Sequence, residues 1–320
     1  MTDHFTIEKP SHLERFVGCL VATFYTTMFF VVAIYSIICA WLIWLDPLSC
    51  LSWILAAPLL LSCLIPPFQC HSMLRLPLFR CMQKYFDFEV IAETTHEELS
   101  KLVKKRQLLH ACQPHGVVSM CGLCWGVLGA HDPTYSNFKT AVASSVRYLP
   151  IVKHAIGMYG EIVDASKKSL MRALQKDSVA LYIGGIAELF LSSTKEEVLY
   201  LKRRKGFIKL ALQSGADVVP SYLFGNTAAL SIVQNKYLAH FARKFGVSIS
   251  WIYGRWGLPI PRPVKMLVVV GRPLGLPHIP SPLQEDIDKW HAVYVAEVVR
   301  IYNKYKEKHP VYREKKLVVT

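Results

Sequence analysis

The sequence predicts an α/β domain built on a partly parallel sheet with flanking helices, preceded by a helical hairpin in a membrane. Strand-like and helix-like segments alternate from residue 108 onward, which is typical of parallel strands joined through helices. Two long uncharged stretches, 16–45 and 48–68, precede this region and are separated by Asp46-Pro47. We therefore expect a membrane anchor followed by a folded domain.

The two uncharged stretches are long enough for a membrane hairpin. At about 1.5 Å per residue, the first exceeds the roughly 30 Å hydrocarbon core of a bilayer. Three prolines punctuate the second, so two spanning helices and one re-entrant hairpin both fit; a buried hairpin of a soluble protein is the alternative. Basic residues flank the hairpin on both sides, which predicts that both of its ends face the cytosol. These are Lys9, Arg15, Arg75, Arg80 and Lys84.

Four regions follow from this reading. Residues 1–15 are expected to form a cytosolic tail, 16–68 the membrane hairpin, and 108–320 the cytosol-facing domain. Residues 69–107 mix bases with aromatics, as an interfacial segment does. The formal net charge of +14 favours phosphates or anionic head groups as partners. Nucleic acid is not expected, because zinc-finger spacing, an RNP-like stripe and basic heptads are all missing from the sequence.

The expected elements of the domain are short. The strands are expected at 108–113, 138–144, 178–183, 217–224 and 266–270. The helices are expected at 97–106, 117–129, 167–176 and 206–214, with a last helix opened by Ser281 or Pro282. In such sheets ligands bind beyond the carboxyl ends of strands.

One histidine lies at such a position. Gln113-Pro114-His115-Gly116 follows the first expected strand, so His115 is placed in a strand-to-helix turn. The proline fixes the backbone before it, and the glycine leaves room for a substrate. His115 is our candidate general base; a histidine that merely packs in a loop is the alternative.

A candidate carboxylate partner follows the 178–183 strand. Glu188 ends the segment Gly184-Gly185-Ile186-Ala187-Glu188, whose two glycines allow a sharp turn close to a ligand. It could reach a site shared with a neighbouring strand end. The alternative is that Glu188 only caps a helix.

A basic segment, Lys202-Arg203-Arg204-Lys205-Gly206, precedes the 206–214 helix. Cations next to a helix N-terminus form a phosphate site, which suits the phosphates of coenzyme A. A solvated or head-group-binding face is the alternative. The nine cysteines all lie within the first 124 residues, and the single pair Cys121 and Cys124 indicates packing rather than redox or metal chemistry.

In this order, the motifs resemble those of the type 2 diacylglycerol acyltransferase family, which includes monoacylglycerol and wax-alcohol acyltransferases. The resemblance spans roughly residues 105–310. The family's His-Pro-His-Gly, Gly-Gly-x-x-Glu and Arg-Lys/Arg-Gly-Phe motifs correspond to the segments at 113–116, 184–188 and 204–207. Further segments that fit the family are Gly215-Ala216-Asp217-Val218-Val219-Pro220, Phe224-Gly225-Asn226, Val269-Val270-Gly271-Arg272-Pro273 and the helix from Asp288 to Tyr294.

Two departures bear on the mechanism. The first histidine of the family motif is Gln113 here, and glutamine cannot accept a proton near neutral pH. Many glycerolipid acyltransferases also place an aspartate five residues after the histidine, where this chain has Met120. Because His115 precedes glycine as the histidine of the wider acyltransferase motif does, we assign the base to His115.

The resemblance implies a glycerolipid-acyltransferase-like sheet and acyl transfer from acyl-CoA to diacylglycerol, giving triacylglycerol. It places the protein in the endoplasmic reticulum membrane or on lipid droplets, without a cofactor or metal, and leaves a homo-oligomer open. His115 and Glu188 would be catalytic. The residues expected to contact substrates are Gln113, Pro114, Gly116, Gly184, Gly185, Arg203, Arg204, Lys205, Gly206 and Asn226. The alternatives are a monoacylglycerol, wax-alcohol or sterol acceptor, or a non-catalytic lipid-droplet or lipid-binding protein with Gln113 as a mark of lost activity.

Overall fold

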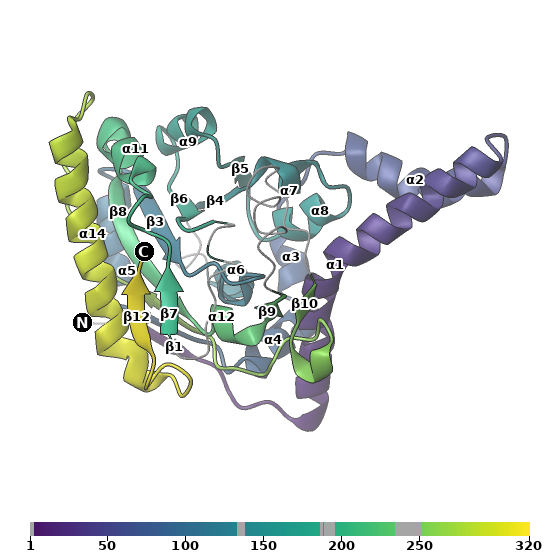
Figure 1. Cartoon of the computed structure of the whole chain (residues 1–320), viewed down its shortest axis with the longest axis horizontal. Helices are drawn as coiled ribbons and strands as arrows, with labels where there is room; N and C mark the ends of the chain where they lie inside the picture. The colour runs from purple at the N-terminus through teal and green to yellow at the C-terminus, as the bar shows by residue number, and fades with distance from the viewer. Residues whose placement is uncertain (1–2, 133–137, 186–187, 189–195, 234–250) are drawn as a thin grey trace.

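A computed structural model describes residues 3–132, 138–185, 188, 196–233 and 251–320. An eight-stranded mixed sheet forms its centre (Figure 1). In spatial order, its strands are β1 (Asp3–Thr6), β2 (Glu89–Ala92), β11 (Leu267–Val270), β8 (Asp217–Phe224), β3 (Leu108–Gln113), β6 (Val179–Tyr182), β4 (Lys139–Val142) and β5 (Ile162–Asp164).

The sheet has a parallel half, as the sequence predicts. The five strands from β8 to β5 run parallel to one another. Strand β11 pairs antiparallel with β8 and parallel with β2, and β1 closes the edge antiparallel to β2. Strands β3 and β8 are buried along their whole length, which explains their nearly continuous apolar sequences.

Helices cover both faces of the sheet (Figure 1). One apolar core lies under α6 (Met120–His131), with α4 (Pro77–Tyr85) and the first part of α1 (His12–Leu45) packed behind it. The other lies under α9 (Lys167–Leu174), α11 (Gly206–Ser214) and α14 (Gln284–Tyr305). Helix α14 buries one stripe of mostly apolar and aromatic side chains: Ile287, His291, Tyr294, Val298, Ile301 and Tyr305.

The remaining described elements are short, except for α2 with its 15 residues. The helices are α2 (Cys50–Leu64), α3 (His71–Leu74), α5 (His96–Val103), α7 (Ser144–Tyr148), α8 (Val152–Gly157), α12 (Asn226–Ala229), and the 3₁₀ turns η2 (Arg255–Gly257) and η3 (Lys306–Lys308). Two small sheets pair β9 (Ser231–Ile232) with β10 (Ile252–Tyr253) and β7 (Glu196–Leu199) with β12 (Lys316–Val319).

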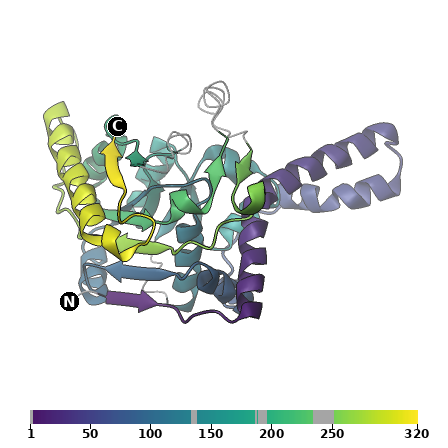
Figure 2. The same cartoon turned by 60° about the horizontal axis from the view of Figure 1, so that its bottom comes forward.

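The N-terminal region joins the fold earlier than the sequence predicts. Residues 3–6, expected in a tail, form edge strand β1 (Figure 2). Strand β2, expected in an interfacial segment, lies inside the sheet between β1 and β11. The folded domain therefore includes residues on both sides of the hairpin, because strand pairing joins positions that local sequence patterns cannot connect.

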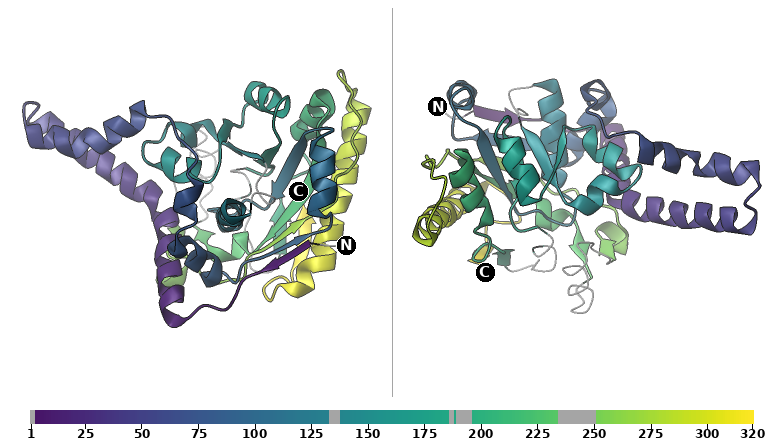
Figure 3. Two further views of the ribbon diagram at one scale, coloured as in Figure 1. Left: turned by 180° about the vertical axis from the view of Figure 1, so that it is seen from behind. Right: turned by 90° about the horizontal axis from the view of Figure 1, so that it is seen from above.

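A helical hairpin projects from the domain, and two views show its helices running antiparallel (Figures 2 and 3). The first part of α1 packs tightly on α4: a Cβ on Gly18 would lie 2.2 Å from the carbonyl oxygen of Cys81. In the outer part, the carbonyl of Leu55 on α2 accepts hydrogen bonds from Tyr35 and Cys39 on α1. Among the described residues, α1 alone is long and apolar enough to cross a membrane. Whether the hairpin spans the bilayer or re-enters stays a prediction.

Two helices begin later than the sequence predicts. The helix after His115 begins at Met120 rather than at Val117, and it ends at His131. Its N-cap is Ser119, whose hydroxyl accepts from the backbone N–H of Gly122. Residues 117–119 therefore complete the turn that carries His115. The last helix likewise begins later, at Gln284, after the Ser281-Pro282 pair.

Candidate active site

The turn after β3 is held close to a second chain segment. Gly116 has φ +65°, and a Cβ there would lie 2.5 Å from the carbonyl oxygen of Asn226. The position therefore requires glycine for two reasons, a left-handed backbone and a close approach. The Gln113–Pro114 peptide is cis. His115 itself is partly exposed at the carboxyl end of the strand, where ligands bind in parallel sheets.

The His115 imidazole has a defined tautomer. Its Nδ1 lies 2.6 Å from the carbonyl oxygen of Gly116, an acceptor only, so Nδ1 carries the proton. Nε2 is then the atom with the free lone pair. The ring of Tyr182 meets the imidazole edge-on, with ring centroids 4.7 Å apart. Burial lowers the pKa of His115 below 6.5, although the bond to Gly116 opposes the shift. A neutral imidazole of this kind can accept a proton at neutral pH.

Glu188 contacts the main chain of His115. Its Oε2 accepts from the backbone N–H of His115 at 3.1 Å, and its Oε1 accepts from that of Tyr200 at 3.3 Å. A Cβ at Gly184 would lie 1.8 Å from the Glu188 carboxyl carbon, so only glycine fits the turn. Burial raises the pKa of Glu188 to about 7, against the two N–H donors that lower it. Glu188 thus joins the segments of His115 and Tyr200, which a residue that only caps a helix would not do. Ile186 and Ala187 lie outside the described residues.

Asn226 fastens the same turn from the other side. Its amide nitrogen donates to the carbonyls of Pro114 and His115 and to the hydroxyl of Ser119, at 3.0–3.2 Å. Its amide oxygen accepts from the backbone N–H of Cys121 at 2.9 Å. The side chain is fully buried and all these partners are protein groups. The structure therefore gives Asn226 a positioning role, and the predicted contact with substrate stays a prediction.

Gln113 faces away from this turn. Its side chain is fully buried, and its Oε1 accepts from the hydroxyl of Tyr294 on α14 at 2.9 Å. Its Nε2 has no hydrogen-bond partner among the described residues. Gln113, which replaces the family histidine, therefore packs against α14, while His115 lies at the strand end. A contact between Gln113 and substrate stays a prediction.

The basic segment adjoins the Gly184 turn. The guanidinium of Arg204 donates to the carbonyl of Gly184 at 3.3 Å and lies over the ring of Tyr200, 5.1 Å from its centroid. Arg203 is exposed, whereas Lys205 pairs with Asp288 at 2.7 Å. Helix α11 begins at Gly206, so its N-terminus adds a partial positive charge here. Because Glu188 also folds against Gly184 and accepts from His115, Arg204 is connected through these residues to the turn that holds His115.

A second buried carboxylate was not foreseen. Glu197 on β7 accepts from the hydroxyl of Thr227 at 2.9 Å, and that hydroxyl also bonds the Tyr312 hydroxyl at 2.7 Å. The Tyr312 hydroxyl accepts from the backbone N–H of Gly225, which precedes Asn226. Burial raises the pKa of Glu197 to about 7. Each of these residues looks ordinary in sequence, and only the fold brings them together.

The sequence did not identify Tyr182 and Ser119 as residues of the site. Tyr182, at the end of β6, contacts the His115 ring, and its hydroxyl bonds that of Ser119 at 2.7 Å. In the sequence, the only sign of a role for Tyr182 was its place at a strand end beside the glycine turn.

Cys121 and Cys124 are buried, and burial raises the pKa of both thiols, which fits cysteines that serve in packing. Within the described residues, no three His, Cys, Asp or Glu side chains gather as a metal site.

A neutral histidine at a strand end, next to a cationic segment, suits an acyltransferase that deprotonates a hydroxyl acceptor. Comparison with known proteins agrees: the family model described as "Diacylglycerol acyltransferase" matches residues 70–320. The protein therefore belongs to the diacylglycerol acyltransferase family and is an acyltransferase.

Several curated relatives are similar over most of the chain. Human diacylglycerol O-acyltransferase 2-like protein 6 is 29% identical, over 76% of this chain and 77% of its own length. Bovine diacylglycerol O-acyltransferase 2 is 28% identical, over 72% of this chain and 68% of its own length. Human 2-acylglycerol O-acyltransferase 3 is 26% identical, over 72% of each. A crystal structure of the 1-acyl-sn-glycerophosphate acyltransferase PlsC of Thermotoga maritima aligns with a TM-score of 0.43 and 11% identity, over 90% of this chain and 97% of that one.

Proposed function

We propose that the protein transfers an acyl group from acyl-CoA to the free hydroxyl of diacylglycerol, forming triacylglycerol. The observation that carries the proposal is the 2.6 Å bond from Nδ1 of His115 to the carbonyl of Gly116, because in the neutral ring this leaves Nε2 as proton acceptor at a strand end. Family membership supports acyl transfer, and the names of the relatives support an acylglycerol acceptor.

In the proposed reaction, Nε2 of His115 removes the hydroxyl proton as the acceptor oxygen attacks the thioester carbonyl. The tetrahedral intermediate collapses, the carbon–sulfur bond breaks, and the CoA thiolate takes the proton from the imidazolium. A positioned base contributes about 10²–10⁴-fold to such a step. Backbone N–H groups at Gly116 or at Gly184 and Gly185 would hold the oxyanion.

The other site residues act by binding or positioning. Glu188 holds the main chain of His115, so it would fix the ring position without touching the imidazole. Arg203, Arg204 and Lys205 would bind the CoA phosphates, with Gly206 opening the helix behind them. The hairpin would keep the site at the endoplasmic reticulum membrane or a lipid droplet, where an insoluble acceptor is available.

A second acceptor is also supported. The relative named 2-acylglycerol O-acyltransferase 3 is about as similar to this chain as the diacylglycerol enzymes are, so monoacylglycerol is the alternative. Wax alcohols and sterols have less support. A non-catalytic lipid-binding protein has little reason to keep the bonded pair of His115 and Glu188.

Acceptor specificity can be tested in microsomes from a host that makes no triacylglycerol. Labelled oleoyl-CoA is offered with diacylglycerol, monoacylglycerol, a long-chain alcohol or a sterol. We expect labelled triacylglycerol to be the main product. Preference for another acceptor would replace the proposed substrate, and no labelled product with any acceptor would contradict the proposed function.

A further inference from the structure

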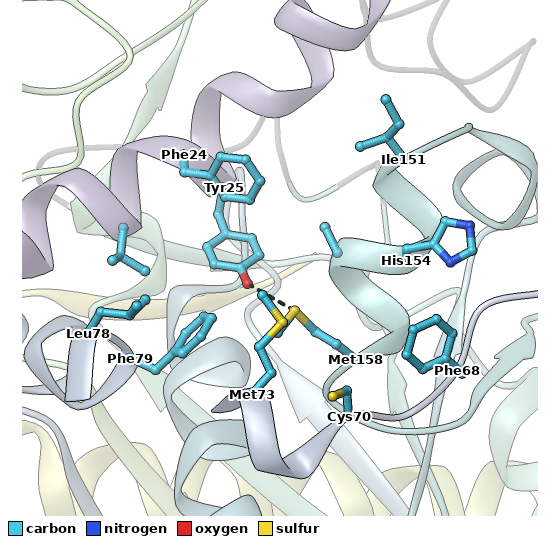
Figure 4. Close-up of a pocket in the computed structure, with 12 residues that line it drawn as sticks. Phe24, Tyr25, Phe68, Cys70, Met73, Leu78, Phe79, Ile151, His154 and Met158 are labelled. Carbon is cyan, nitrogen blue, oxygen red and sulfur yellow. Dashed lines mark hydrogen bonds between the residues drawn. The ribbon is translucent and has the colours of Figure 1, made fainter. Parts of the chain in front are cut away.

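An apolar cavity lies where the membrane hairpin joins the domain (Figure 4). Its volume is about 470 Å³, within the range of about 300–1,000 Å³ that is usual for small-molecule sites. Its walls come from α1, from the segment that follows the hairpin, and from α8. Its lining includes Phe24, Tyr25, Phe68, Met73, Ala155 and Met158.

The polar atoms of the lining are directed at protein partners. The hydroxyl of Tyr25 points to the sulfur of Met158 (Figure 4). The imidazole Nε2 of His154 lies 3.2 Å from the carbonyl of Ser62. Among the residues that the structure describes, no Asp, Glu, Lys or Arg side chain lines the cavity. An occupant with a charge would lose its hydration without a partner, whereas a hydrocarbon chain would not. The lining therefore selects an uncharged, apolar group.

The mouth of the cavity continues the exposed surface of the hairpin. Phe24, Phe68 and Met73 line the cavity and are still 51%, 62% and 49% exposed. Large exposed apolar side chains extend from there along both hairpin helices: Val31, Ile34, Ile37, Ile38, Trp41, Trp44, Trp53, Ile54, Leu60, Leu61 and Leu64. An apolar surface of this extent contacts lipid rather than water. A chain could thus pass from the bilayer into the cavity without meeting water.

Helix α6 links the cavity to the catalytic turn. It begins five residues after His115, and it packs on α3 and α4, which help to form the cavity. Arg75, next to α3, donates to the carbonyl of Ala130, and Gly126 lies against the ring of Tyr159, which follows Met158. The basic segment before α11 lies on the other side of α6 from α1 and α8 (Figure 1). Donor phosphates and a bilayer lipid would therefore reach the turn from opposite sides.

We propose that the cavity receives one hydrocarbon chain of the uncharged acylglycerol acceptor, which enters sideways from the bilayer beside α1. This inference rests on the proposed function for the identity of the lipid. It assigns acceptor binding to the root of the hairpin, which then serves as an entry route as well as an anchor.

The test measures binding without turnover. A diacylglycerol with a diazirine in one chain is added to the full chain in phosphatidylcholine nanodiscs, in the His115→Ala background, and irradiated. We expect label on peptides that carry Phe24–Tyr25 and Met158. Ala155→Trp fills the cavity and Met73→Trp obstructs its mouth, so both should lose most of this label. The control Ile37→Trp adds the same ring to the lipid-facing hairpin and should keep it.

Other outcomes overturn the inference. Equal labelling of Ala155→Trp, Met73→Trp and the control would show that the chain binds elsewhere. Unlabelled diacylglycerol should compete with the probe, and competition by oleoyl-CoA but not by diacylglycerol would assign the cavity to the donor. Thermal unfolding of each variant shows whether it is folded. If Ala155→Trp fails to fold, Met73→Trp, at a half-exposed position, decides whether the chain binds in the cavity. Cavity labelling in a chain that acylates no acceptor would refute the proposed function alone.

Discussion

The backbone N–H of His115 donates a 3.1 Å hydrogen bond to Oε2 of Glu188, which lies 73 residues further along the chain. The bond joins the turn after β3 to the turn after β6, two neighbouring strands of the sheet. Gly184, against which Glu188 folds, also accepts from Arg204. The base, the buried carboxylate and the cationic segment thus form one connected unit.

The pH dependence of the reaction should report the burial of His115. Because burial lowers its pKa below 6.5, the base stays neutral to a lower pH than a free histidine does. We expect kcat/KM for acyl transfer to fall only below pH 6.5. Tyr182→Ala removes the ring that covers His115, so kcat/KM should begin to fall at a higher pH; Tyr182→Phe keeps the ring and should shift this pH less. A fall in wild-type kcat/KM that begins above pH 6.5 would contradict the assignment.

Asn226 should be sensitive to a change of one atom. Asn226→Asp keeps an acceptor for the N–H of Cys121 but loses the donor to Pro114 and His115. Buried carbonyls left unpaired cost about 1–3 kcal/mol each, so unfolding should require less denaturant and activity should fall. The control Asn303→Asp, exposed on α14, should change neither. Normal activity and denaturation of Asn226→Asp would exclude the positioning role.

Glu197 should make stability depend on pH. Its folded pKa of about 7 lies above the ordinary 4.5, so its contribution is present below pH 4.5 and is lost as pH rises through 7. The cost reaches about 3 kcal/mol at most. Glu197→Gln, measured by chemical unfolding, should therefore gain stability relative to wild type from about pH 5 to about pH 8. For the exposed control Glu314→Gln, the difference in unfolding free energy from wild type should not change with pH. If the difference for Glu197→Gln also stayed constant with pH, that would count against a buried, protonated carboxyl.

The basic segment should affect the donor. Arg203→Gln removes an exposed charge, so KM for acyl-CoA should rise by roughly fivefold or less, with kcat unchanged. Arg204→Gln also loses the bond to Gly184, so kcat should fall as well. Lys209→Gln, an exposed change on α11, the helix that follows the basic segment, is the matched control. If Arg203→Gln and Arg204→Gln have the same KM for acyl-CoA at low salt as the control Lys209→Gln, the assignment of the basic segment to CoA fails.

Local patterns predicted much of the domain. Strands β3 and β8 match their expected bounds, and α11 ends where Gly215 takes a left-handed conformation of φ +74°. Continuous apolar runs and a terminal glycine act within a few residues, so the sequence displays them directly.

Long-range pairing could not be predicted in this way. Strand β1 pairs with β2 more than eighty residues away, and nothing in residues 3–6 indicates a partner. At the site, motifs led to His115 and Glu188 as candidates, but they could not reveal the contact between the two residues, which is through the main chain of His115. The Glu197 network depends on three separate segments meeting.

Acyl transfer by a His115→Ala variant tests the central claim most directly. Wild type, His115→Ala and exposed His278→Ala are expressed to equal levels in the same microsomes and given labelled oleoyl-CoA with diacylglycerol. We predict that His115→Ala lowers kcat by about 10²–10⁴-fold while His278→Ala keeps wild-type activity. Full activity of a folded His115→Ala variant would contradict the account.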